Sequence, residues 1–318
     1  MAREPLRDGD PSRVGRYRLT ARLGAGGMGV VYLGTGPDSP DYPDGPDSGD
    51  RGQVAVKVLR PELADDPEFR ARFGREVASL MRVRGECTVR VVEADTESSR
   101  PFMVTEYTDG PSLSEYIDTG GPLGADMLYG LATGLAEALA AIHAAGVVHR
   151  DLKPSNVILG RAGPKVIDFG IAQTLDATSV TKTGMMVGSA GFMAPEQVTG
   201  RASQAADIFA WAVTVAYAAS GEPPFGTGEP MAILYRILHE SPDVAAVPAA
   251  LRPLVMSALA KDPRQRPTAR ELLDRLADPA ARYDRPARPV LASTWPSTAS
   301  LLLEPGTSPP PGRRRLRR

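Results

Sequence analysis

Residues 149–156 read His-Arg-Asp-Leu-Lys-Pro-Ser-Asn, and residues 166–170 read Val-Ile-Asp-Phe-Gly. The Asp151 carboxylate can accept a proton from an attacking hydroxyl, and Lys153 adds a positive charge two positions later. Asn156 and Asp168 offer hard oxygen ligands of the kind that Mg²⁺ prefers. An acidic loop with a purely structural role could imitate one segment. The two segments together, in this order and so close in the sequence, indicate an enzyme that transfers phosphoryl groups.

Upstream of these segments, residues 24–29 read Gly-Ala-Gly-Gly-Met-Gly and fit the pattern G-x-G-x-x-G. The dinucleotide-binding form of that pattern needs a helix directly after the glycines, whereas the strand-like Val30-Val31-Tyr32-Leu33 follows here. We therefore expect a strand–turn–strand hairpin whose backbone can approach phosphates without a Cβ in the way. An ordinary Gly-rich hairpin is the alternative when this segment is considered alone.

Lys57 ends the apolar run Val54-Ala55-Val56-Lys57. An unpaired buried ammonium is costly, so an anionic partner is expected. Two candidates are the phosphates of a nucleotide and Glu76, on an amphipathic helix further along the chain. The alternative is an edge-strand lysine whose ammonium reaches solvent.

Hydrophobic periodicity predicts a lobe of strands followed by a lobe of helices. Strand patterns cover residues 17–23, 30–35, 53–59, 89–94 and 102–106, with one amphipathic helix at 67–83 between them. Helical patterns then cover a long Ala-rich segment through 128–142 that Gly146 should end, followed by 204–220, 229–240, 249–260 and 268–277. The sequence thus predicts an α+β fold in which a small mainly-β lobe joins a larger mainly-α lobe.

Composition excludes several classes of protein. The chain has 318 residues, with 37 basic against 38 acidic side chains, so no global positive field draws it to nucleic acid. A single cysteine, Cys87, excludes an internal disulfide, and three histidines argue against a zinc cluster. The N-terminus lacks an apolar signal core, and the longest charge-free apolar run, 208–219, is far short of the ~20 residues of a membrane span. We expect a soluble, cytoplasmic protein.

Together these segments resemble the signature set of the bacterial eukaryotic-like (Hanks-type) Ser/Thr protein kinases, over about residues 16–278. The resemblance continues through the end of an activation segment at 188–196, through Asp207 at a helix start, and through Arg266, which would pair with Glu196. It implies a bilobal kinase domain at 16–278. Its parts would be an N-lobe (16–105), a hinge (106–109) and a C-lobe (110–278), between an N-terminal extension (1–15) and a disordered Pro/Arg-rich tail (279–318).

The resemblance also implies a role for individual residues. Asp151, Lys153, Lys57 and Glu76 would be catalytic, and Asn156 and Asp168 would hold Mg²⁺. The ATP contacts would be Leu23, Gly24, Ala25, Gly26, Gly27, Met28, Gly29, Val30, Val31, Ala55, Lys57, Glu106, Thr108 and Ile158. His149 and Phe169 would pack in the core, and Thr105 would be the gatekeeper at the back of the adenine pocket.

Arg150 lies directly before Asp151. By the resemblance, an arginine at this position implies an activation segment that phosphorylation must order. The expected autophosphorylation sites are Thr181 and Thr183, and their phosphates would bond to an arginine cluster that includes Arg150. The expected partners are protein substrates with Ser or Thr acceptors, and a homodimer that phosphorylates in trans fits the same picture. No nucleic acid is expected.

Several alternatives stay open at this point. A pseudokinase scaffold would bind nucleotide without transfer, but it normally lacks the lysine, the base or the metal aspartate, and all are present here. A small-molecule phosphotransferase would not be expected to keep Glu196 and Arg266. The basic end 313–318 is either a solvated tail or a contact with an anionic membrane, and the acidic loop 36–52 is either solvated or a partner site. Substrate, activating signal, oligomeric state and completeness of the chain are not given by the sequence.

Overall fold

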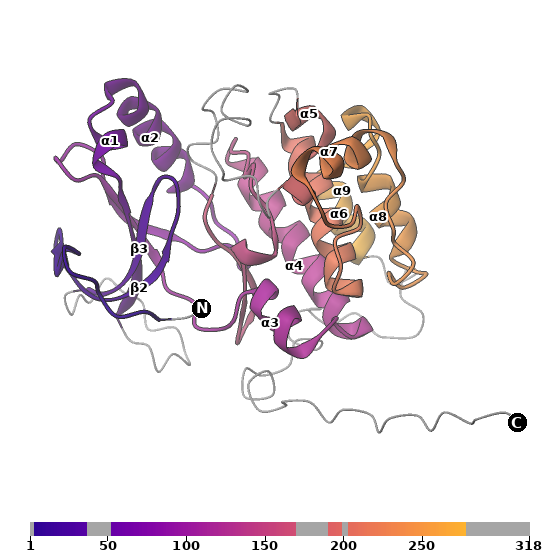
Figure 1. Ribbon diagram of the computed structural model, residues 1–318, viewed down its shortest axis with the longest axis horizontal. Helices are drawn as coiled ribbons and strands as arrows, with labels where there is room; N and C mark the ends of the chain where they lie inside the picture. The colour runs from indigo at the N-terminus through magenta and orange to yellow at the C-terminus, as the bar shows by residue number, and fades with distance from the viewer. Residues whose placement is uncertain (1–2, 37–51, 170–189, 199–202, 278–318) are drawn as a thin grey trace, which may run out of the picture.

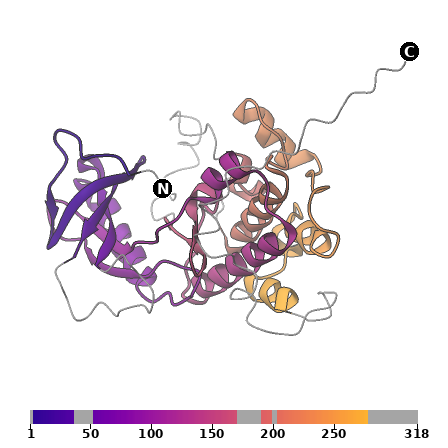
Figure 2. The same ribbon diagram turned by 90° about the horizontal axis from the view of Figure 1, so that it is seen from below.

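The computed structural model describes residues 3–36, 52–169, 190–198 and 203–277, which form two lobes (Figure 1). The N-lobe holds a six-stranded antiparallel sheet in the order β1-β2-β3-β4-β6-β5. Its strands are β1 (Arg13–Val14), β2 (Tyr17–Ala25), β3 (Gly29–Thr35), β4 (Gln53–Leu59), β5 (Val91–Asp95) and β6 (Phe102–Glu106). In the orthogonal view the sheet and the helical lobe again stand apart (Figure 2).

The alternation of side chains along β4 determines the face of the sheet on which Lys57 lies. Val54, Val56 and Val58 lie in a cluster with Tyr17 and Val104 on one face. Side chains alternate across a strand, so Ala55, Lys57 and Leu59 point to the opposite face. Leu59 packs there with Phe73 and Val77 of helix α2 (Pro67–Leu80), which follows the short α1 (Pro61–Ala64). Lys57 therefore shares its face with α2.

Helix α2 is shorter than the predicted 67–83. The Asp66 side chain caps its start by accepting hydrogen bonds from the backbone N–H groups of Glu68 and Phe69. At the other end, the amides of Arg82 and Val83 bond three residues back, to Ser79 and Leu80, so the chain tightens into a 3₁₀-like turn after residue 80.

The predicted strand at 89–94 is observed later, as β5 from Val91 to Asp95. Residues 87–89 pair elsewhere: the Val89 amide donates to the Val166 carbonyl at 3.2 Å, and the Val166 amide donates to the Cys87 carbonyl at 2.8 Å. This short segment therefore joins the N-lobe to the strand that leads into Asp168.

The C-lobe is built on helices, with one small hairpin of β7 (Val157–Gly160) and β8 (Gly163–Val166). Its helices are α3 (Leu113–Gly120), α4 (Ala125–Ala144), α5 (Pro195–Val198), α6 (Gln204–Ser220), α7 (Pro230–His239), α8 (Arg252–Ala258) and α9 (Ala269–Ala277). Short 3₁₀ turns lie at Pro154–Asn156, Ala190–Phe192 and Pro263–Gln265. Helix α4 contacts α6, α9 and β8, so it is the central element of this lobe.

Helix α4 is also the one described helix that is long and apolar enough, by length and composition, to cross a membrane. Its Leu131, Leu135 and Leu139 are fully buried inside the C-lobe. A core helix of a folded domain has the same properties.

The segment predicted as an N-terminal extension is structured from residue 3 onward. Strand β1 pairs with β2, and Glu4 forms a separate antiparallel bridge with Arg22 of β2. This part of the chain is thus attached to the N-lobe sheet.

Candidate active site

The loop before β7 is held by a buried carboxylate on α6. One oxygen of Asp207 accepts a hydrogen bond from the Arg150 amide at 2.8 Å, and the other accepts one from the His149 amide at 2.8 Å. His143 Nε2 lies 2.8 Å from the second oxygen. Arg150 has φ +68°, a conformation that is strained for a residue with a Cβ. Asp207 therefore stabilises a backbone turn that the chain would not hold alone, in the scaffold role that the sequence predicts.

Three predicted site residues meet on this loop. The Lys153 ammonium lies 2.9 Å from Oδ2 of Asp151. Asn156 Nδ2 donates to the same oxygen at 3.1 Å and to the Asp151 carbonyl at 2.8 Å. Because its nitrogen faces Asp151, Asn156 can offer its Oδ1 to a cation. The predicted proton acceptor, the predicted positive charge and one predicted metal ligand thus lie in contact on one loop.

His149 and Phe169 are packing residues here. His149 is fully buried, and its Nε2 lies 3.1 Å from the Ile167 carbonyl, while the Asp151 amide donates to its Nδ1 at 3.3 Å. These contacts fit a neutral ring with the proton on Nε2. The ring centroids of His149 and Phe169 are 5.6 Å apart. Both side chains support the loops on either side of the cleft.

Lys57 of the N-lobe contacts the second metal-ligand candidate, Asp168. Its ammonium lies 2.8 Å from Oδ1 of Asp168. Desolvation raises the pKa of Asp168, but the neighbouring positive groups, chiefly the Lys57 ammonium, together leave the pKa below its usual range. Asp168 also has φ +54°, so this aspartate, like Arg150, occupies a strained backbone position at the site.

Glu76 is paired with Arg150, and the Lys57–Glu76 ion pair predicted from the sequence is not present in this structure. Arg150 Nη1 lies 3.0 Å from Glu76 Oε1. Glu76 Oε2 and Arg150 Nε are both buried without a hydrogen-bond partner among the described residues. Burial raises the pKa of Glu76, against the effect of Arg150. Each of the two residues thus has a polar atom that its present partner leaves unsatisfied.

The Gly-rich segment forms the expected hairpin between β2 and β3. The Gly26 amide donates to the Gly29 carbonyl at 2.9 Å, and the Arg60 guanidinium donates to the Gly26 carbonyl at 2.9 and 3.1 Å. A Cβ on Gly29 would lie 1.9 Å from the Val58 carbonyl oxygen, whereas one on Gly24 or Gly26 would meet nothing within 4 Å. Gly29 is therefore required by packing, and Gly24 and Gly26 leave open space for a ligand.

The other predicted ATP contacts lie on both sides of the junction between the lobes. Val31 is the register partner of Lys57, and Ala55 is the partner of Thr105. Glu106 ends β6, Thr108 follows it, and Ile158 lies buried in β7 on the C-lobe side. Pairing of β3, β4 and β6 thus brings Val31, Ala55 and Glu106 together in the N-lobe sheet, whereas Ile158 belongs to the separate β7–β8 hairpin.

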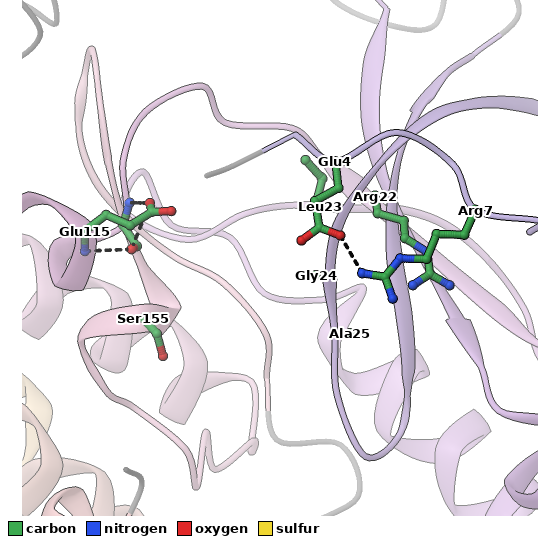
Figure 3. A pocket seen from close by; sticks show the side chains of 9 residues that line it. Glu4, Arg7, Arg22, Leu23, Gly24, Ala25, Glu115 and Ser155 are labelled. Carbon is green, nitrogen blue, oxygen red and sulfur yellow. Dashed lines mark hydrogen bonds and ion pairs between the residues drawn. The ribbon is translucent and has the colours of Figure 1, made fainter. Parts of the chain in front are cut away.

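A cavity of about 440 Å³ lies at the mouth of this junction (Figure 3). It is lined by Glu4, Arg7, Arg22, Leu23, Gly24, Ala25, Ser112, Glu115 and Ser155. Of these, the sequence predicts only Leu23, Gly24 and Ala25. Glu4 and Arg7 belong to the N-terminal segment, and their charged, unpatterned surroundings carry no sequence signal for a place at the site.

The residues fit a metal that is shared with phosphate oxygens. The described residues contain no group of three or more His, Cys, Asp or Glu that could hold a metal ion. Mg²⁺ is usually bound by one or two protein carboxylates together with substrate phosphates. Asn156 and Asp168 match that smaller donor set.

The end of the activation segment is anchored as predicted. Two guanidinium nitrogens of Arg266 lie 2.7 and 2.9 Å from the two carboxylate oxygens of Glu196. Arg266 also donates to the carbonyls of Ala260, Ala205 and Lys261. The predicted phosphosites Thr181 and Thr183, the tail 279–318 and most of the loop 36–52 lie outside the described residues.

Comparison with known proteins agrees with this geometry. The family model "Protein kinase domain" matches residues 17–276. The probable serine/threonine-protein kinase PkwA of Thermomonospora curvata is 43% identical over 97% of this chain and 41% of its own length. The serine/threonine-protein kinase AfsK of Streptomyces coelicolor is 42% identical over 86% of this chain and 33% of its own length. The chain therefore spans a third to two fifths of the length of these relatives.

A solved structure extends the likeness to the fold. The crystal structure of the Mycobacterium tuberculosis PknI kinase domain superposes with a TM-score of 0.63 at 27% identity. It covers 87% of this chain and 98% of that one. The predicted bilobal α+β fold is confirmed by this likeness together with the observed lobes.

Proposed function

The chain belongs to the protein kinase family, and from that premise we propose that it transfers the γ-phosphoryl group of Mg-ATP to Ser and Thr hydroxyls of proteins. The observation that carries the proposal is the assembled loop of Asp151, Lys153 and Asn156. Use of ATP with a divalent metal and of protein substrates is general to the family. The choice of Mg²⁺ rests on the oxygen donors Asn156 and Asp168.

In the proposed reaction Asp151 orients the acceptor hydroxyl and takes its proton. The hydroxyl oxygen forms a bond to the γ-phosphorus as the bond to the β–γ bridging oxygen breaks, and ADP leaves. Lys153, 2.9 Å from Asp151, places a positive charge beside the transferring group. When bound, Mg²⁺ neutralises phosphate oxygens, and Asn156 and Asp168 would hold it. Transfer of this kind depends mainly on positioning and charge.

The pseudokinase alternative is not favoured, because Lys57, Asp151 and Asp168 are all present, and Lys57 lies against Asp168. However, two groups that the proposed reaction needs are paired elsewhere in this structure: Lys57 with Asp168, and Glu76 with Arg150. We infer that Lys57 exchanges Asp168 for Glu76 and nucleotide phosphates before transfer. Glu76 Oε2, buried without a partner, is the atom that would receive the Lys57 ammonium.

Phosphorylation of Thr181 and Thr183 is the proposed trigger for that exchange. A phosphate brings roughly −1.5 to −2 charges, and it would compete with Glu76 for Arg150, whose Nε is buried without a partner. Mass spectrometry after incubation with Mg-ATP should locate phosphate on these two residues. Phosphate found only in the tail would contradict this assignment. Reaction in trans within a homodimer and a cytoplasmic location complete the proposal, and a membrane contact would be made only through the basic end 313–318.

The proposed activity is tested by incubating the chain with labelled ATP, Mg²⁺ and generic protein substrates. Loss of a general base typically lowers the rate by about 10²–10⁴-fold, and we expect this for Asp151→Asn. The control is Asp118→Asn, which changes an exposed carboxylate on α3 and should leave the rate unchanged. An Asp151→Asn rate equal to that of the wild type would overturn the proposal.

A further inference from the structure

Residues 3–10 run along the edge of the cavity at the junction of the lobes, which Glu4 and Arg7 help to line. The Glu4 amide donates to the Arg22 carbonyl at 3.0 Å, and the Arg22 amide donates to the Glu4 carbonyl at 2.8 Å. Arg22 lies on β2 directly before Leu23 and Gly24, where the pairing of β2 with β3 shifts register. Residues 3–10, the N-terminal strap, are therefore attached to the strand that enters the Gly-rich hairpin.

Asp10 is the anchor of the strap. Its carboxylate accepts hydrogen bonds from Arg22 Nε and Nη2, both at 2.7 Å, from the Tyr32 hydroxyl at 2.8 Å and from the Arg7 amide at 2.7 Å. Only 5% of the Asp10 side chain is exposed. The bond to Arg22 is the main reason why the pKa of Asp10 lies well below its usual range. A bidentate pair in a largely buried setting fixes geometry as well as adding stability.

Arg3, at the other end of the strap, contacts the hinge. Its Nη2 lies 3.2 Å from the Tyr107 hydroxyl and 3.3 Å from Oδ1 of Asp109. The guanidinium carbon also lies 5.3 Å from the centroid of the Tyr107 ring. The Arg3 and Asp109 side chains are 43% and 48% exposed, so this contact is weaker than the Asp10 anchor.

Between these two attachments the strap forms a wall of the cavity at the cleft mouth. Figure 3 shows Glu4, Arg7 and Arg22 on one side of the cavity, with Glu115 and Ser155 on the other. Glu4 and Arg7 are paired with each other at 2.7 Å. The strap thus joins the strand that enters the hairpin to the hinge, the two elements between which a nucleotide would bind.

We propose that the N-terminal strap is a positioning element for the nucleotide. Asp10 and Arg3 hold the β2 strand at a fixed place relative to the hinge and thereby raise the affinity for Mg-ATP. They act through Arg22 and through Tyr107 and Asp109, so they are positioning residues rather than catalytic ones. The inference rests on the proposed use of ATP and adds the strap to the parts of the chain that set nucleotide affinity.

The test is equilibrium binding of a fluorescent ATP analogue with Mg²⁺, together with KM for ATP and kcat at saturating ATP. We expect Asp10→Ala to raise Kd and KM by about tenfold, which is 1.4 kcal/mol, and Arg3→Ala by about two- to threefold, in line with an exposed pair. For both variants kcat should stay within about twofold of wild type, because the strap does not touch Asp151. Asp8→Ala, which removes an exposed carboxylate of the same segment, is the matched control and should change neither constant.

A purely structural role gives a different result. Asp10→Ala would then lower the melting temperature of the free chain while its Kd, measured well below that temperature, equalled the wild-type value, and this outcome would overturn the inference. If Asp10→Ala does not fold, the exposed Arg3→Ala decides, and an unchanged Kd overturns the inference. A wild type that binds Mg-ATP but transfers no phosphoryl group would overturn the proposed function alone, since the strap is tested by binding.

Discussion

The two halves of the site differ in how completely their side chains are partnered. On the C-lobe side, Asp151, Lys153 and Asn156 contact one another, and Asp207 bonds to the backbone beneath them. Where α2 and Lys57 of the N-lobe meet the C-lobe loops, Lys57 and Glu76 are each paired with a C-lobe residue, and buried polar atoms of Glu76 and Arg150 have no partner among the described residues.

This difference assigns different tasks to the two halves. A fully bonded loop costs no reorganisation when substrate arrives, which favours transition-state stabilisation. A buried polar atom without a partner is costly, so an arrangement that gives Glu76 Oε2 and Arg150 Nε a partner would recover that cost. Under the proposed function, the C-lobe half carries the chemistry, and the ion pairing of the N-lobe half decides whether that chemistry can proceed.

The largest effect is expected at Lys57. In Lys57→Met no ammonium remains for Glu76 or for phosphate, so kcat should fall to less than a tenth of wild type, at least about 1.4 kcal/mol in barrier. The fold should change little, because the Asp168 side chain that loses its partner is 38% exposed. Steady-state kinetics and thermal unfolding measure both quantities. A variant with more than a tenth of the wild-type kcat would show that Lys57 is not needed.

A stability effect is expected at the bonded half. Asp207→Asn replaces one of the two carboxylate oxygens with an NH₂ group, so the backbone N–H of either His149 or Arg150 loses its acceptor. A buried donor without its acceptor costs about 1–3 kcal/mol, and denaturant unfolding should show a loss of about that size.

The control for this prediction is Asp274→Asn, which breaks an exposed ion pair with Arg270 on α9. Surface pairs contribute about 0–1 kcal/mol, so its stability should stay close to wild type. Equal losses of unfolding free energy in Asp207→Asn and Asp274→Asn would mean that the hydrogen bonds of Asp207 stabilise the fold no more than an exposed ion pair does.

The partner exchange itself is probed at Arg150. Arg150→Ala removes the guanidinium that pairs with Glu76 and that would bind a phosphate of the activation segment. Phosphorylation should therefore no longer change the rate of this variant strongly. We expect phosphorylation to raise the wild-type rate by about tenfold or more, the equivalent of 1.4 kcal/mol, and to raise the Arg150→Ala rate far less. Comparing phosphatase-treated and phosphorylated samples of both proteins provides the measurement. A similar gain in both would exclude Arg150 as the coupling residue.

The smallest effect concerns the titration of Glu76. Its pKa is raised in the folded protein by burial, so the charged form carries a stability penalty that is present at neutral pH and disappears as pH falls below the usual carboxyl pKa. Glu76→Gln should therefore melt higher than wild type at pH 7, by no more than about 2–4 °C, and the gain should vanish near pH 4. Glu62→Gln, at an exposed position on α1, should show no such dependence.

Much of this site could be predicted from the sequence because its determinants are local. The Val-rich apolar run that ends at Lys57 predicts a strand, and the β-branched residues after Gly29 predict a hairpin rather than a helix. Both β4 and the β2–β3 hairpin are observed. One short loop carries Asp151, Lys153 and Asn156, so their spacing in the sequence already predicts that they lie close together.

What could not be predicted depends on how distant elements are placed. Lys57 can reach Glu76 or Asp168, and the choice depends on the position of α2 relative to the C-lobe loops, which no sequence pattern encodes. The N-terminal strap could not be predicted either. No pattern in the sequence marks Asp10 and Arg22 as partners, and they meet only because residues 3–10 fold back along β2. Long-range ion pairs of this kind have no periodicity for a pattern to detect.

The central claim is that the N-lobe half of the site exchanges its ion pairs while the C-lobe half stays fixed. A crystal structure of the phosphorylated chain with Mg²⁺ and a non-hydrolysable ATP analogue tests it most directly. We predict the Lys57 ammonium within hydrogen-bond distance of Glu76, Arg150 released from Glu76, and the contacts among Asp151, Lys153 and Asn156 unchanged. A structure in which Lys57 still pairs with Asp168, and Glu76 with Arg150, would contradict the account.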